Sequence, residues 1–256
     1  MSMTEKHFSR GADSYASLAT VQKRIAAALI QEIPNGFFRG ADLGSGPGVN
    51  FAALREKAQS IIGIDISPAM TARAARTGVP AARAVTGDIE NIPLPADSCD
   101  LIFSSMALHW CRLEKAFREI RRISRNGAFI ALAIPVTGTL KELSEDLEKA
   151  GLPGRCMKFR NLTEIHALLD ECGIAGKAAS QDSAGIITRE RIFQERYDSI
   201  RAYLDSIRKI GASGVSGSPM PREACRRFFR ILGERQTRNA LIHTYSTAFV
   251  LGYLKK

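Results

Sequence analysis

The sequence of 256 residues predicts an α/β protein with a doubly wound, mostly parallel, seven-stranded sheet and a helical insertion before its last strand. Two observations favour this fold. Short apolar runs alternate with helix-like segments over residues 36–136, as expected for parallel strands that are buried on both faces. After Pro135 the pattern becomes mainly helical, and residues 240–254 return to an alternating, β-rich pattern that predicts a strand returning to the sheet.

The individual elements follow in chain order. Residues 18–33 place Leu and Ile side chains at helical spacing and predict an amphipathic helix. Five strands are then predicted at GADLG, SIIGIDIS, ARAVTGD, CDLIFSS and GAFIALAIP, separated by helix-like stretches such as FAALREKAQ, SPAMTARAAR and LEKAFREIRRIS. The insertion is expected to contain helices at LKELSEDLEKAG, LTEIHALLDECG, RERIFQERYDSIRAYLDSIRKI and REACRRFFRILGERQ.

Glycine and proline divide the second half of the chain. Gly173 and Gly211 are placed as helix C-terminal stops, and residues 211–221 read as a loop. We therefore expect three parts: a first helix and the core sheet in residues 1–136, a mainly helical substrate or partner insertion in residues 137–239, and the returning strand in residues 240–256.

Composition limits the class of protein. Hydrophobic residues make up 45% of the chain and charged residues 24%, which is ordinary for a soluble globular protein. The first residues are polar rather than a secretory signal, and no apolar run approaches the roughly 20 residues of a membrane span. Five scattered cysteines without a C-x-x-C pair argue against a metal site and a disulfide framework. We expect a cytoplasmic protein without a metal.

The positive charge is concentrated near the end of the chain. The formal net charge is +10, and residues 201–256 hold eleven Lys and Arg against three Asp and Glu. Such a block predicts either a docking surface for an acidic partner, a nucleic acid or an acidic protein, or a solvated face with no partner.

The stretch ADLGSGPGVN at residues 41–50 predicts a glycine loop at a helix N-terminus, where backbone N–H groups come close to a ligand. Gly44 and Gly46 fit the dinucleotide fingerprint G-x-G-x-x-G, but its third position falls on Val49. The G-K-[ST] ending of a phosphate-binding loop is also absent. Asp42, at the end of the incoming strand, argues against an anionic ligand and suits one with an amine or sulfonium, such as S-adenosylmethionine.

Two further carboxylates follow at successive strand ends. Asp65 follows Gly44 by twenty-one residues, where it can accept hydrogen bonds from both ribose hydroxyls. Asp88 follows the third strand and can accept from the adenine amino group, with Ile89 packing on the ring. The alternative is that Asp65 and Asp88 cap the following helices.

These motifs resemble the class I S-adenosylmethionine-dependent methyltransferases. DLGSGPG, GIDIS, GDIENIPLP and DLIFSSMALHW are similar to successive motifs of that superfamily across about half the chain. The resemblance implies S-adenosylmethionine as cofactor and S-adenosylhomocysteine as product. It also implies these cofactor-binding residues: Tyr15, Asp42, Gly44, Ser45, Gly46, Gly48, Asp65, Ile66, Met70, Asp88, Ile89 and Ser104.

Four segments, most of them outside those motifs, resemble one family more closely. HFSRGADSY, SSMALHWC, and IRKIGASGVSG followed by LIHTYSTAFVLGYL are similar to the malonyl-acyl-carrier-protein O-methyltransferases of biotin synthesis. The resemblance implies methylation of the free carboxylate of a malonyl thioester. His109 stands where that family often has Gln. A His at this position also suits generic small-molecule methyltransferases. A methyltransferase for another small acid or for RNA, and a non-enzymatic S-adenosylmethionine-binding module, stay as alternatives.

The expected chemistry needs little from the protein's side chains. A malonyl carboxylate is already ionised at neutral pH, because its reference pKa is about 4. No general base is required, and the protein acts by alignment and proximity. Tyr15 and His109 are the candidate catalytic residues: the resemblance puts Tyr15 in a lid over the cofactor, and His109 on the substrate side. The alternatives are packing roles for both, as for Trp110 and Met70.

The basic block then has a candidate partner. Acyl carrier proteins are acidic, so a positive rim would steer their docking. We do not expect nucleic acid or membrane as the partner, since the block lacks interleaved aromatic residues that could stack on bases. We expect a monomer, with the carrier protein contacted by Arg208, Lys209, Arg226, Arg227 and Arg230.

Overall fold

The computed structural model describes residues 20–175, 185–209 and 220–256. Tyr15 with the predicted lid segment, Gly211 and most of the loop predicted at 211–221 lie outside the described residues. The backbone of Arg208 and Lys209 is described, but their side chains are not.

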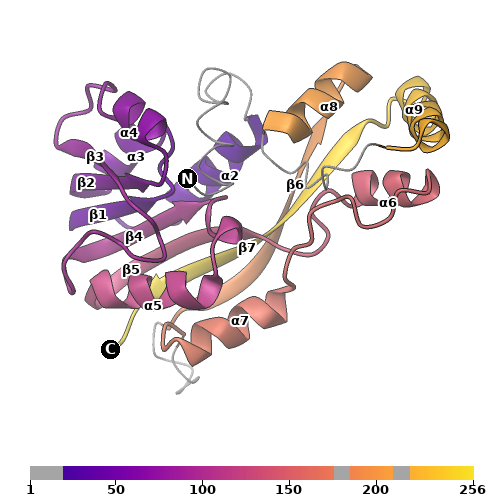
Figure 1. The fold of residues 1–256 in the computed structure, drawn as a ribbon. Helices are drawn as coiled ribbons and strands as arrows, with labels where there is room; N and C mark the ends of the chain where they lie inside the picture. The colour runs from indigo at the N-terminus through magenta and orange to yellow at the C-terminus, as the bar shows by residue number, and fades with distance from the viewer. Residues whose placement is uncertain (1–19, 176–184, 210–219) are drawn as a thin grey trace.

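Seven strands form one sheet in the order β3-β2-β1-β4-β5-β7-β6 (Figure 1). Strands β1 to β5 pair in parallel, and β7 runs antiparallel between β5 and β6. This confirms the predicted doubly wound, mostly parallel, seven-stranded sheet with the last strand returning to it. The strands are β1 (Phe37–Leu43), β2 (Ala58–Asp65), β3 (Ala82–Thr86), β4 (Cys99–Ser105), β5 (Ser124–Pro135), β6 (Ile187–Arg196) and β7 (Ile242–Tyr253).

Helices cover both faces of the sheet and bury two hydrophobic cores. Leu101 and Phe103 of β4 pack in the core shared with α2, whereas Ile102 between them packs in the core shared with α5. This alternation follows from the period of two along a strand. The helices are α2 (Thr20–Gln31), α3 (Phe51–Arg55), α4 (Pro68–Ala74), a short 3₁₀ helix η1 (Leu108–Trp110), α5 (Leu113–Ile123), α6 (Lys141–Lys149), α7 (Leu162–Glu171), α8 (Ile200–Lys209) and α9 (Arg222–Thr237).

Two predicted helices are wrong in part. The helix expected over residues 189–210 is β6 in its first half, followed by α8. Five of the ten β6 residues, ITRERIFQER, are charged, as suits an edge strand with exposed side chains, and within this strand only Phe193 is buried. The backbone is nevertheless paired with β7 from Ile187 to Arg196. The helix after the glycine loop is also shorter than expected, since α3 ends at Arg55 and β2 already begins at Ala58.

The segment between β5 and β7 is anchored to the sheet by a buried polar cluster. Arg235 of α9 places its Nε 2.6 Å from a carboxylate oxygen of the fully buried Asp146 of α6. The His243 ring of β7 stacks on Tyr203 of α8 at 3.9 Å between centroids. Figure 1 shows α6, α8 and α9 gathered around the starting end of β7.

This cluster places α9 at the same end of the sheet as the glycine loop. Pro135, the last residue of β5, pairs with Thr247, so residues 242–246 of β7 extend beyond the carboxyl end of β5. The loop leaves the carboxyl end of β1, which runs parallel to β5 in the sheet.

Candidate active site

A cavity of about 290 Å³ opens at the carboxyl ends of β1, β2, β3 and β4. Ligands of open α/β sheets bind at this edge. The described residues that line it come from the last residues of β2 and β4 and from the segments that follow the four strands: Gly44, Gly46, Asp65, Ile66, Met70, Asp88, Ile89, Glu90, Ser105, Met106, Ala107, Trp110, Cys111 and Arg112.

The three glycines of the loop differ in what they permit. All have positive φ, at 75° for Gly44, 53° for Gly46 and 77° for Gly48. A Cβ on Gly44 would lie 2.2 Å from the Cβ of Ala107, and one on Gly48 would lie 2.9 Å from Phe51, so both positions are closed to side chains. A Cβ on Gly46 would meet nothing within 4 Å. The missing side chain of Gly46 therefore leaves open space beside the cavity, whereas Gly48 is a structural glycine that does not line it.

Asp65 lines the cavity and holds the glycine loop in place. Its Oδ2 accepts a hydrogen bond from the Gly46 amide at 2.9 Å, and its Oδ1 accepts from the Ser67 amide at 2.9 Å. Burial raises the pKa of Asp65, and the two backbone hydrogen bonds oppose that rise. The N-cap of α4 is Ser67, whose side chain accepts from the Met70 amide, so Asp65 is not the helix cap.

Asp88 also lines the cavity, but from an exposed position. Its Oδ1 accepts from the Glu90 amide at 2.9 Å, which fixes the turn that carries Ile89. No helix follows directly, because residues 87–98 run into β4, so Asp88 caps no helix either. Ile89 and Met70 are both buried, and both line the cavity. Met70 therefore fills the core and also contributes to the cavity wall.

Asp42 lies beneath the glycine loop rather than on the cavity wall. Only 1% of its surface is exposed, and its Oδ2 has no hydrogen-bond partner among the described residues. Burial, together with the nearby negative charge of Asp65, raises its pKa to about 8. A buried carboxylate without a partner is costly, and a cationic ligand group would offset that cost.

Further polar atoms that have no hydrogen-bond partner in the described part of the chain surround a smaller recess of about 50 Å³. This recess shares Gly44, Gly46, Ser105 and Met106 with the main cavity. The polar atoms are Gln22 Oε1, Ser45 Oγ and Ser105 Oγ. The predicted Ser45 thus belongs to this polar end of the site. The sequence analysis missed Gln22 and Ser105. Gln22 lies on α2, and its position beside the glycine loop becomes visible only in the folded structure.

Ser104 was predicted to line the cofactor site, but in the structure its neighbour Ser105 lines the cavity instead. Ser104 is fully buried, and its hydroxyl donates to the carbonyl of Leu43 at 2.7 Å, which ties β4 to β1. Because side chains alternate along a strand, Ser105 faces the cavity when Ser104 faces away from it.

The substrate-side loop contributes Trp110 to the cavity, although Trp110 was expected only to pack. His109 does not line the cavity. Its ring lies 5.0 Å from that of Trp110 and 5.9 Å from that of Phe159, and its buried Nδ1 has no hydrogen-bond partner among the described residues. Burial lowers the pKa of His109 to about 3, so the imidazole is neutral at physiological pH. Burial likewise raises the pKa of the Cys111 thiol to about 12, so no thiolate nucleophile forms there.

Arg226 and Arg230 of the predicted docking set are exposed on α9, and Arg227 pairs with Glu223 at 3.7 Å. Arg222 lies one turn before Arg226 on the same helix face, since residues four apart are neighbours. Within the described ranges, no group of His, Cys, Asp and Glu side chains could hold a metal ion. No helix among the described residues is long and apolar enough to cross a membrane.

Comparison with known proteins agrees with this geometry. A model of the methyltransferase domain matches residues 41–132, the span that carries the cavity. Among solved structures, the YcgJ protein of Bacillus subtilis superposes with a TM-score of 0.63 at 19% identity, covering 91% of this chain and 99% of that one. A putative methyltransferase of Haloferax volcanii, solved with its Trm112 activator, gives 0.59 at 18% identity, covering 97% and 98%. The chain is therefore an S-adenosylmethionine-dependent methyltransferase with the class I fold.

Relatives identify the family within that class. Malonyl-[acyl-carrier protein] O-methyltransferases of Pectobacterium atrosepticum and Dechloromonas aromatica are 32% and 31% identical, covering 84% and 80% of this chain and 80% and 75% of the relatives. That of Alcanivorax borkumensis is 27% identical over 97% of this chain and 85% of its own length. The chain belongs to the malonyl-[acyl-carrier protein] O-methyltransferase family.

Proposed function

We propose that the protein transfers a methyl group from S-adenosylmethionine to the free carboxylate of a malonyl thioester carried on acyl carrier protein, as a step of biotin synthesis. The observation that carries the proposal is a match that extends beyond the methyltransferase core: the Alcanivorax relative aligns over 97% of this chain. The insertion that follows β5 is therefore shared with the relatives named for this substrate. We further propose a monomer that acts in the cytoplasm, with residues 137–239 as its substrate and partner region.

The cavity fits the cofactor at both ends. The polar recess with Ser45, Ser105 and Gln22 would hold the amino acid end. The ammonium group of that end would offset the cost of the buried Asp42 carboxyl beneath the glycine loop, whose Oδ2 has no partner among the described residues. Asp65 would accept from the ribose hydroxyls with the acceptor capacity left after its two backbone bonds.

The adenine end of the site is assigned to the next loop. Asp88 would accept from the adenine amino group, and Ile66, Met70 and Ile89 would pack on the ring, since all of them line the cavity. Gly44 and Gly46 let the ligand approach the backbone of the first loop closely, and Gly48 supports that loop from below.

The chemistry supplied by the bound cofactor is a methyl group on a positively charged sulfur. The substrate carboxylate forms the new oxygen–carbon bond while the sulfur–carbon bond breaks and the sulfur keeps the electron pair. The protein needs no base for this step, which agrees with the lowered pKa of His109, because a neutral imidazole with a pKa of about 3 has little affinity for a proton. Its residues hold the two reactants in line and exclude water.

His109 and Tyr15 remain the proposed catalytic residues, His109 at the substrate and Tyr15 over the cofactor. A neutral imidazole can donate one hydrogen bond without drawing off the charge of the reacting carboxylate. His109 Nδ1 has no hydrogen-bond partner among the described residues, and under this proposal the substrate carboxylate would supply one. Trp110, which lines the cavity, would cover the malonyl group from the same loop.

Helix α9 is the proposed docking surface for the acidic carrier protein. Arg226 and Arg230 form an exposed basic row with Arg222, and this helix lies at the cavity end of the sheet. Arg227 borders the row, and Arg208 and Lys209 belong to the neighbouring helix α8. Positive charge around the entrance would raise the association rate of an acidic partner.

The direct test supplies methyl-labelled S-adenosylmethionine with malonyl-acyl-carrier protein, malonyl-coenzyme A or RNA. We expect base-labile label on the malonyl group, and a lower KM for malonyl-acyl-carrier protein than for malonyl-coenzyme A. Label on RNA would replace the proposed substrate, and cofactor binding without transfer to any of the three would favour a binding module.

A second test separates docking from chemistry. The variant Arg226→Glu/Arg230→Glu should raise the KM for the carrier-bound substrate at low salt and leave that for malonyl-coenzyme A unchanged. The matched control is Arg201→Glu, an exposed arginine on α8 outside the α9 row. Equal KM values for the α9 variant and wild type would remove α9 from the docking surface.

A further inference from the structure

The loop from Gly87 to Ser98 gives the cavity its proposed adenine side but forms almost no regular structure. Asp88, Ile89 and Glu90 line the cavity, and a single isolated bridge pairs Asp88 with Asn91. Backbone groups of such a loop need partners from elsewhere if the loop is to keep one conformation.

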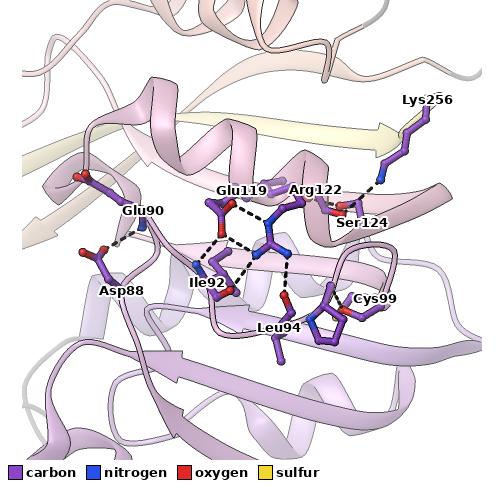
Figure 2. A network of polar contacts seen from close by, with 12 residues as sticks. Asp88, Glu90, Ile92, Leu94, Cys99, Glu119, Arg122, Ser124 and Lys256 are labelled. Atoms are coloured by element: carbon purple, nitrogen blue, oxygen red, sulfur yellow. Dashed lines mark hydrogen bonds and ion pairs between the residues drawn. The ribbon is translucent and has the colours of Figure 1, made fainter.

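Two side chains of α5 provide these partners, as Figure 2 shows. Glu119 Oε2 accepts a hydrogen bond from the Ile92 amide at 2.7 Å. Arg122 donates from Nη2 to the Ile92 carbonyl and from Nη1 to the Leu94 carbonyl, both at 2.8 Å. Together they satisfy both backbone groups of Ile92, in the way that a neighbouring strand would.

The two side chains also hold each other. Arg122 Nε and Nη2 each lie 2.7 Å from a different oxygen of Glu119, which is the bidentate arrangement that fixes a guanidinium in one plane. The hydrogen bond from Arg122 lowers the pKa of Glu119, and the pair stays charged. We call Glu119 and Arg122 the α5 clamp. Neither residue lines the cavity.

A second attachment lies at the start of the same helix. Glu90 accepts from the Arg112 amide and from Arg112 Nε, both at 2.8 Å. The loop is therefore held to α5 on both sides of Asn91. Ile89 lies between the attachments and the glycine loop, 3.7 Å from the position of a Cβ on Gly44.

We propose that the α5 clamp is a positioning device for the adenine end of the cofactor. By fixing Ile92 through its amide and carbonyl, Glu119 and Arg122 set where Asp88 and Ile89 meet the base, although they do not touch it. The proposal rests on the proposed function only in its cofactor, not in its methyl acceptor. The proposed role differs from that of an ordinary ion pair on a helix surface, which would stabilise α5 and would not affect the conformation of the loop.

The test compares three changes on α5. Arg122→Met removes both loop contacts, and Glu119→Arg/Arg122→Glu restores an ion pair but offers an acceptor and a donor to the wrong backbone groups. Arg118→Met is the matched control, an exposed arginine of the same helix away from the loop. Calorimetry measures the Kd for S-adenosylhomocysteine and for adenosine, and kinetics measures KM for S-adenosylmethionine and kcat.

We expect Arg122→Met to raise both Kd values and the KM about tenfold, equivalent to about 1.4 kcal/mol, with kcat at saturation within twofold of wild type. The swapped pair should be equally impaired, and the control should match wild type. Amide exchange at Ile92 should be faster in both impaired variants. If Arg122→Met does not fold, Arg122→Lys, which keeps the charge and one contact, should still raise the Kd for adenosine about threefold.

Recovery of adenosine affinity in the swapped pair would show that only the ion pair matters and would overturn the proposal. Unchanged affinity in Arg122→Met, or a fall in kcat with unchanged KM, would overturn it as well. Failure of the wild-type protein to bind either ligand would instead overturn the cofactor assignment. Failure to methylate malonyl-acyl-carrier protein would leave the clamp result standing.

Discussion

The buried carboxyl of Asp42 gives the most quantitative prediction. Its Oδ2 lacks a partner among the described residues, and its pKa is raised to about 8 from 3.8, chiefly by burial. The ligand-free folded protein therefore holds the Asp42 proton more tightly than the unfolded chain does. Its contribution to stability is complete below pH 4 and is lost as the pH rises through 8. The full shift corresponds to about 6 kcal/mol, at 1.36 kcal/mol per pH unit.

The variant Asp42→Asn keeps the shape of the side chain and removes the titration. Between pH 5 and pH 8, the free energy of unfolding of wild type should fall relative to that of Asp42→Asn by about 4 kcal/mol, because the slope for one proton is about 1.4 kcal/mol per pH unit until the folded pKa is reached. Above pH 8 the difference should level off. Urea unfolding of the ligand-free proteins at pH 5, 6, 7, 8 and 9 measures it.

Asp198→Asn is the control, because Asp198 is exposed in the turn before α8. It should follow wild type at every pH. A difference between wild type and Asp42→Asn that stays constant from pH 5 to pH 9 would refute the reasoning. A second readout uses calorimetry in buffers of different ionisation enthalpy: S-adenosylhomocysteine should release close to one proton from wild type at pH 7 and none from Asp42→Asn.

Three more predictions follow from the described contacts. Gly44→Ala should abolish cofactor binding in calorimetry, because its Cβ would fall 2.2 Å from that of Ala107. The pH profile of kcat/KM should show no limb near 6.5 from His109, whose pKa is lowered to about 3, and NMR titration should find its ring neutral down to pH 5. Arg235→Met should lower the free energy of unfolding by about 3–5 kcal/mol, because it leaves the buried Asp146 without its ion pair.

Each of these three has a control or a contrary outcome. Gly46→Ala meets no atom within 4 Å, so it should fold with only the cost of its positive φ, and equal behaviour of the two alanine variants would contradict the clash. An imidazole that titrates near pH 6 would show that His109 is not buried as described. Arg238→Met, an exposed change at the end of α9, should leave stability unchanged.

Much of the fold was predictable because parallel strands that are buried on both faces have continuous apolar sequences. The run CDLIFSS coincides with β4, and LEKAFREIRRIS contains α5. Strand β6 was missed because it is an edge strand whose side chains are mostly exposed and half of them charged, so its pattern resembles that of an exposed helix. Pairing with β7, and not local propensity, decides its structure.

The site was predictable where it follows the glycine loop and the ends of strands. Asp65, Asp88 and Ile89 line the cavity as expected from their spacing. Ser105 was missed because one residue along a strand changes the face of the sheet. The α5 clamp was missed because its contacts join residues 27 to 30 positions apart, and no periodicity along the chain reports such contacts.

The place of β7 between β5 and β6 has a consequence for how the protein is made. Phe129 pairs with Tyr253, so the central part of the sheet closes over a separation of more than 120 residues. Until β7 has been synthesised, the edges of β5 and β6 that pair with it have no partner strand. Unpaired strand edges can pair with other chains and lead to aggregation. The high contact order favours slow folding. Ribosome-bound chains that end before Ile242 are therefore the species most in need of a chaperone.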